Sequence, residues 1–156
     1  MKALTFIPRS AQKTTVIPFE PSARRIKVSL HQLVNDLLAS LQPLAMKRNN
    51  IVLNGVPQGL CFIAEENVMA YVLWNIINTV VSNKKNECIH VQTLVDDDRT
   101  MICVKDAGNY LYRSLASEYR KLQDAAEQVG GCINVYNDEK YGSNIVFSIS
   151  NTRMAV

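Results

Sequence analysis

The sequence contains no hydrophobic run that is long enough to cross a membrane. All of its apolar stretches fall well short of the ~18 residues that a spanning helix requires. The first residues, MKALTFIPRSAQK, also lack the apolar region of about 7 to 15 residues that a signal peptide carries. These two absences predict a cytoplasmic protein.

Paired cysteines are also missing. The chain has four cysteines but no C-x-x-C motif, which excludes the commonest ligand spacing of structural zinc sites. Only Cys88 has a histidine close by, His90, two residues further on. Each thiol lies in or beside an apolar stretch, so we expect buried, reduced thiols, with a metal or disulfide role as the alternative. The cysteines are Cys61, Cys88, Cys103 and Cys132.

No spacing in the chain indicates a Ser-His-Asp or Cys-His catalytic arrangement, and no two carboxylates stand out as an acid and base pair. We therefore expect His31 and His90 to be structural or surface residues rather than sites of phosphorylation. The acidic run Asp96, Asp97 and Asp98 is expected to be a solvated hairpin tip, with a cation site as the alternative.

The chain does contain enough apolar material for one globular domain. Of its 156 residues, 47% are hydrophobic and 20% are charged, which suits one domain with at most an added arm. The net charge of +3 is too small to indicate nucleic acid or any other particular partner. We expect a domain over residues 25–151 and a tail over residues 152–156.

Residues 1–24 are predicted to be an N-terminal arm, because Pro8, Pro18 and Pro21 interrupt them. Two short β-prone pieces in this arm, ALTFI and TTVIPF, can form a hairpin or add to the edge of a sheet. The start of the chain is also basic, which favours either contact with an anionic surface or a simple solvated segment. Residues 1–30 carry one acid, Glu20, against Lys2, Arg9, Lys13, Arg24, Arg25 and Lys27.

Hydrophobic periodicity predicts a two-layer α+β sandwich, in which one mixed sheet carries three helices on one face. Ser29 is expected to cap the first helix, which Pro43 should kink or bring to its last turn. Gly130 and Gly131 should end the third helix. The predicted strands are residues 25–29, 50–56, 60–64, 88–97, 100–106, 132–138 and 143–150, and the predicted helices begin at residue 30 and span residues 66–82 and 114–129.

This order of elements resembles the catalytic ATP-binding domain of sensor histidine kinases, within the histidine-kinase-like ATPase (GHKL) superfamily. The resemblance covers residues 25–150 and implies the Bergerat fold. It is carried by the order and spacing of four stretches, VSLHQLVNDLLASLQPLAMKRNN, AEENVMAYVLWNIINTVVSN, MICVKDAG and LQDAAEQVGGCINVYNDEKYGSNIVFSI.

The family motif N-x-x-x-N-A-x-K falls on the second helix. Asn75 matches its first asparagine, whereas Thr79 stands where the resemblance implies an asparagine that coordinates magnesium. A threonine hydroxyl is a poorer ligand than an amide carbonyl, and Asn78 points about 100° away around the helix. The structural alternative for Asn75 is a hydrogen bond to nearby backbone.

The family's D-x-G-x-G adenine motif is matched by Asp106 and Gly108, and its second glycine is Tyr110. The resemblance implies that Asp106 accepts a hydrogen bond from the adenine amino group. The alternatives are that Asp106 caps a turn, and that Tyr110, with Tyr112 and Tyr119, fills the nucleotide's volume.

The phosphate-binding lid of the family is missing. Residues 109–113, NYLYR, are the whole expected connection before the third helix, and SLAS at residues 114–117 replaces a glycine-rich turn. Without these features the γ-phosphate has no cradle of backbone amides.

The resemblance implies a role in two-component-type signal transduction. Because three features of the nucleotide site are lost, we expect a pseudokinase without a cofactor, a non-catalytic module that binds a kinase, a response regulator or a similar protein. A homodimer through the N-terminal arm is also expected. The alternatives are a stand-alone kinase that still binds Mg-ATP through Asp106, and a structural homo-oligomer.

Overall fold

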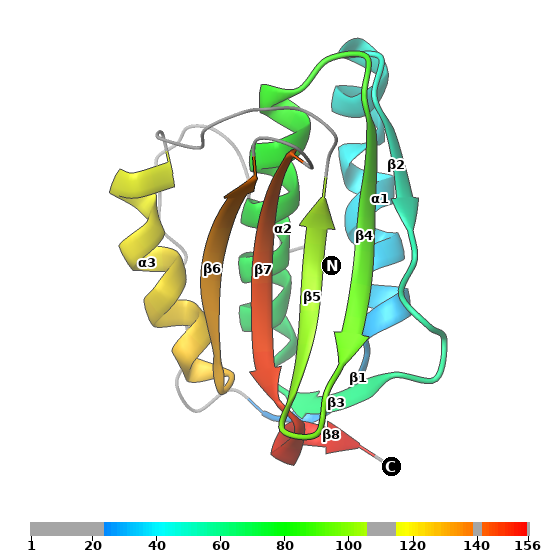
Figure 1. Cartoon of the computed structure of the whole chain (residues 1–156). Coiled ribbons are helices and arrows are strands. Elements are labelled where there is room, and N and C mark those ends of the chain that lie inside the picture. The colour runs from blue at the N-terminus through cyan, green and yellow to red at the C-terminus, as the bar shows by residue number, and fades with distance from the viewer. Residues whose placement is uncertain (1–23, 106–114, 139–141, 156) are drawn as a thin grey trace.

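The computed structural model describes residues 24–105, 115–138 and 142–155, which form two sheets and three α-helices (Figure 1). Within these residues no helix combines the length and apolarity needed to cross a membrane. The helices are α1 (Leu30–Lys47), α2 (Glu66–Asn83) and α3 (Leu115–Gln128), with a short 3-10 helix η1 (Asn151–Arg153) near the C-terminus. All three α-helices lie on one face of the larger sheet (Figure 1).

The larger sheet has five strands in the order β2-β4-β5-β7-β6. Its one parallel pair is β2 with β4, and the remaining neighbours are antiparallel. The strands are β2 (Ile51–Asn54), β4 (Cys88–Val95), β5 (Arg99–Lys105), β6 (Gly131–Asp138) and β7 (Gly142–Ser150). The predicted α+β architecture with three helices on one face is therefore confirmed.

The prediction of a single sheet is wrong, because a second antiparallel sheet forms in the order β1-β3-β8. Its strands are β1 (Ile26–Ser29), β3 (Cys61–Ala64) and β8 (Met154–Ala155). The backbone amide of Leu30 donates to the carbonyl of Leu60, which fixes β3 beside β1 rather than beside β2. Met154 and Ala155, which the sequence analysis placed in a tail, pair with β3.

The helices begin and end close to the predicted positions. The Ser29 side chain accepts the backbone N–H of Gln32 at 3.3 Å and so caps α1 as expected. Pro43 lies inside α1, one turn before its end. The apolar residues of α2 recur at helical spacing, and they lie in the core. The buried residues of α2 are Val68, Met69, Val72, Leu73, Ile76, Ile77, Val80 and Val81.

Asn50 joins the two layers where α1 ends. Its amide Nδ2 donates to the carbonyl oxygens of Val81 and Lys84, both at 3.0 Å, and so binds the end of α2. Its Oδ1 accepts the backbone N–H of Glu87 at 3.0 Å, just before β4 begins. The residue is only 7% exposed, so each of these bonds replaces a contact with water.

The turn between α3 and β6 depends on two glycines. Gly130 has a φ of 79°, the left-handed conformation predicted for the end of α3. At Gly131 the constraint is space, because a Cβ there would collide with the carbonyl oxygen of Ser148 and lie 2.6 Å from the Phe147 ring. β6 can therefore lie this close to β7 only when residue 131 has no side chain.

We predict that Gly131→Ala lowers the free energy of unfolding by about 2–4 kcal/mol, because the added methyl must displace either backbone or a buried ring. Gly59→Ala is the matched control, since a Cβ there meets nothing within 4 Å and should change stability by less than about 0.5 kcal/mol. Urea unfolding followed by circular dichroism measures both. Equal effects from the two variants would contradict the close approach of β6 and β7.

We also predict that Asn50→Ala lowers the free energy of unfolding by about 2–4 kcal/mol, because it removes three hydrogen bonds made by a side chain that is only 7% exposed. Asn50→Asp should cost at least as much at neutral pH, since a carboxylate would face two carbonyl oxygens. Gln42→Ala, which removes an exposed amide from α1, is the control. A decrease in the free energy of unfolding below about 1 kcal/mol for both Asn50 variants would show that the hydrogen bonds of Asn50 contribute little to stability.

Candidate functional site

The candidate site is the polar face of α2. Asn75 and Thr79 lie one turn apart on this face, and both are half-buried. The opposite side of the helix is fixed in the core by Ile76, Ile77 and Val80. β5 runs toward the end of the molecule where α2 ends and α3 begins (Figure 1). Residues 106–114, between β5 and α3 in the sequence, lie outside the described part of the chain.

The polar side chains of α2 bind the backbone of their own helix. Asn75 Nδ2 donates to the Tyr71 carbonyl oxygen, and Thr79 Oγ1 donates to that of Asn75, each at 2.7 Å. Asn83 Nδ2 continues the series by donating to the Thr79 carbonyl oxygen at 2.7 Å. We call these three side chains the α2 ladder. Each reaches one turn back, a local bond that Thr and Asn make readily.

The ladder places the hydroxyl proton of Thr79 against helix backbone. The structural alternative proposed for Asn75, a hydrogen bond to nearby backbone, is therefore present in the structure. Asn78 belongs to a different group, because its Oδ1 accepts a 3.4 Å hydrogen bond from Ser82 Oγ. Asn83 was missed by the sequence analysis, although its spacing of four residues from Thr79 was a usable signal.

The other predicted site residues, Asp106, Gly108 and Tyr110, lie outside the described residues, and so does Tyr112. The predicted NYLYR connection at residues 109–113 is outside them as well. The described part of the candidate site is therefore the polar face of α2 alone.

His31 has a structural role, as expected. Its Nδ1 lies 2.7 Å from the carbonyl oxygen of Val56, and its Nε2 lies 3.1 Å from Asn35 Nδ2. Asn54 joins the same group by donating to Asn35 Oδ1 at 2.7 Å and to the His31 carbonyl oxygen at 3.1 Å. Both ring nitrogens of His31 thus help to fix the loop after β2 against α1.

The acidic run forms the exposed tip of the β4–β5 hairpin, as predicted. Its backbone is held by Asn151, whose Nδ2 donates to the carbonyl oxygens of Asp96 at 2.6 Å and Asp97 at 3.1 Å. Thr100 Oγ1 donates to Asn151 Oδ1 at 2.7 Å. Sequence reasoning missed Asn151, because nothing in a local pattern shows that residue 151 returns to residue 96.

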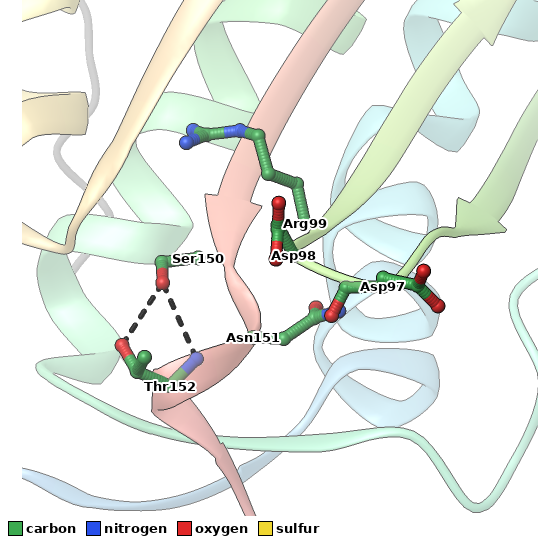
Figure 2. A pocket seen from close by; sticks show the side chains of 6 residues that line it. All are labelled: Asp97, Asp98, Arg99, Ser150, Asn151 and Thr152. Atoms are coloured by element: carbon green, nitrogen blue, oxygen red, sulfur yellow. Dashed lines mark hydrogen bonds between the residues drawn. The ribbon is translucent and has the colours of Figure 1, made fainter.

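An open depression of about 590 Å³ lies beside this tip, and Figure 2 shows the six residues that line it. The carboxylates of Asp97 and Asp98 point in different directions (Figure 2). No group of three or more His, Cys, Asp or Glu side chains among the described residues is arranged to hold a metal ion. The depression is lined by Asp97, Asp98, Arg99, Ser150, Asn151 and Thr152.

The four cysteines are all free thiols. The expectation that they are buried is wrong for Cys88, which is exposed and lies 3.5 Å from His90 Nε2. Cys61, Cys103 and Cys132 are half-buried. These sulfur atoms lie at the faces of strands rather than in the core, so an apolar stretch in the sequence does not by itself give the depth of a side chain.

Searches for a matching family model and for curated relatives found no match. Known structures do match closely in fold. The histidine kinase AdeS of Acinetobacter baumannii aligns with a TM-score of 0.71 and 10% identity, over 82% of this chain and 68% of that one. The nucleotide-free catalytic domain of histidine kinase ThkA aligns with a TM-score of 0.66 and 17% identity, over 81% and 95%.

The mycobacterial sensor histidine kinase MprB aligns with a TM-score of 0.65 and 10% identity, over 81% of this chain and 97% of that one. The chain spans only 31% of full-length ShkA and 41% of the ThkA chain in its complex with the response regulator TrrA. At these identities the matches show the fold. The chain has the fold of the catalytic domain of histidine kinases.

Proposed function

We propose that this chain is a non-catalytic module of two-component-type signal transduction, which acts in the cytoplasm and binds a signalling protein through its surface. The observation that carries the proposal is the α2 ladder. Thr79 stands where the resemblance implies a magnesium-binding asparagine, and its hydroxyl donates to the carbonyl oxygen of Asn75. The fold is retained, but the side chain at the position where the resemblance implies a metal ligand forms a hydrogen bond to the backbone of its own helix.

Magnesium chemistry explains why this substitution matters. Mg²⁺ needs a nearly octahedral set of oxygen ligands and gives up its water molecules reluctantly. An asparagine offers a carbonyl oxygen on a longer side chain, which reaches beyond the helix surface. The Thr79 oxygen is held beside the backbone by a 2.7 Å hydrogen bond. Moving it toward a metal would cost that bond and would leave a weaker ligand in place of an amide.

The partner is proposed from chemistry and from fold. Histidine kinase ThkA has been solved in complex with the response regulator protein TrrA, and this chain aligns with that kinase at a TM-score of 0.64. A module that has kept the fold but not the phosphate-binding chemistry can still present a surface to such a protein. A response regulator is therefore the partner class that we propose first.

One alternative has support in the sequence. Asp106 and Gly108 keep two positions of the adenine motif, so a stand-alone kinase that binds Mg-ATP weakly is the second candidate. The two functions differ in one measurable property, the affinity for nucleotide in the presence of magnesium.

Calorimetric titration with a non-hydrolysable ATP analogue, with and without Mg²⁺, tests this difference. We expect no saturable binding up to about 1 mM, which means a binding free energy weaker than about −4 kcal/mol. Asp106→Asn should give the same trace as the natural chain, and Thr79→Asn serves as the variant with the amide restored. Micromolar binding that needs both magnesium and Asp106 would instead establish the kinase.

Binding to a response regulator is tested separately, with fluorescently labelled receiver domains from the organism that carries this chain. We expect at least one receiver domain to bind with micromolar affinity, about −8 kcal/mol, and an excess of nucleotide to leave that affinity unchanged. Unlabelled receiver domain should compete. If no receiver domain binds at about 100 µM, or if binding requires nucleotide, the proposal of a non-catalytic partner module is wrong.

A further inference from the structure

Cys88 and His90 lie side by side on β4, on the face of the larger sheet that carries no helix among the described residues (Figure 1). They are two residues apart, so their side chains point to the same face, whereas Ile89 between them is buried in the core. Cys88 is exposed and His90 is half-buried. The Cys88 Sγ and His90 Nε2 atoms lie 3.5 Å apart. A thiol and an imidazole nitrogen thus meet at the surface of the sheet.

This separation matches the one that a tetrahedral zinc ion imposes on two of its ligands. Zinc binds a cysteine sulfur at about 2.3 Å and a histidine nitrogen at about 2.0–2.1 Å. At the tetrahedral angle of about 109°, these bond lengths place the sulfur and the nitrogen about 3.5 Å from each other. Cys88 and His90 therefore already have the spacing of two zinc ligands, and we call them the half site.

One chain supplies only two of the ligands that such a site needs. A structural zinc ion takes four protein ligands. Among the described residues, no third Cys, His, Asp or Glu side chain joins the half site to form a metal-binding group. Gln92 follows on the same face of β4, and Lys105 pairs with His90 across β4 and β5, but neither is a ligand type that zinc prefers. A complete tetrahedron needs two further ligands from elsewhere.

The surface beside the half site is suited to contact with protein. β2 is the edge strand of the larger sheet, and its register places Ile51 beside Cys88 and Leu53 beside His90. The Ile51 side chain is 62% exposed and that of Leu53 is 44% exposed, although both are large and apolar. A small apolar patch with a polar rim is the usual composition of a protein interface. The exposed side chains of Gln92 and Lys105 supply such a rim.

We propose that a zinc ion joins two copies of this chain, with Cys88 and His90 of each copy as its four ligands. A twofold axis through the ion brings the same two residues from both copies, so a single half site is enough to build a Cys₂His₂ tetrahedron. Each Cys88 thiol gives up its proton to solvent on binding, and the two thiolates balance the charge of Zn²⁺. The axis also brings Ile51 and Leu53 of both copies toward each other, which removes apolar surface from water.

Sedimentation equilibrium of the full chain with increasing zinc chloride tests the proposal, in the presence of a phosphine reductant that keeps the thiols reduced. We expect the apparent mass to rise about twofold as zinc reaches about one ion per two chains, and to fall back when EDTA removes the metal. A hydrogen bond between the thiol and the ring would give the same spacing without this response. An apparent mass that is the same with and without zinc would overturn the proposal.

Point variants assign the ligands. Cys88→Ser and His90→Gln each remove two of the four ligands from the pair of chains. Loss of an outer partner of a ligand already costs about 10–100-fold in metal affinity, so each variant should raise the zinc concentration at half-maximal dimer by more than about 100-fold. Cys103→Ser is the matched control, because it removes a half-buried thiol from the same face, beside Gln92, and should leave this concentration unchanged.

Circular dichroism establishes that each variant is folded, and exposed Cys88 can be replaced without disturbing the core. Equal zinc concentrations at half-maximal dimer for the natural chain and for both ligand variants would overturn the proposal. A similar loss in Cys103→Ser would also overturn it, because zinc would then not depend on the half site.

Discussion

The hydrogen bonds of the Asn50 side chain, which we call the Asn50 joint, hold the helix layer and the larger sheet in a fixed relative position. α1 ends just before it, α2 ends against its amide nitrogen, and β4 begins where its oxygen accepts the backbone N–H of Glu87. Arg48 strengthens the same joint, because its Nε donates to the Lys84 carbonyl oxygen at 2.7 Å. Since α2 carries the candidate site, the position of that site is fixed by hydrogen bonds at the C-terminal end of the helix, close to Thr79.

The same joint explains why β2 can lie parallel to β4. Parallel neighbours need a long crossover, and here the crossover runs through β3 and α2 before the chain returns. The Ile51 amide donates to the Glu87 carbonyl oxygen at 2.9 Å, so pairing of the two strands begins directly beside Asn50. A buried polar side chain thereby lies at the point where the backbone pairing of β2 with β4 begins.

Much of the fold could be predicted from sequence because its signals are local. The helical spacing of apolar residues gave α2, and Ser29 and the two glycines marked the ends of helices. The separate three-stranded sheet could not be predicted, because β8 finds β3 across about ninety residues and two residues carry no pattern. The site shows the same contrast. The resemblance to a family motif singled out Asn75 and Thr79, whereas the binding of their polar groups to helix backbone is visible only in the structure.

The pairing of β8 with β3 also bears on how the molecule is made. β1 and β3 can pair as soon as the first 64 residues have formed, whereas β8 comes from residues 154 and 155. During synthesis the edge of β3 therefore stays open until almost all of the described chain has left the ribosome. An open strand edge is a place where chains pair wrongly. The short β8 closes that edge, so this edge of β3 is without its neighbouring strand until residues 154 and 155 arrive.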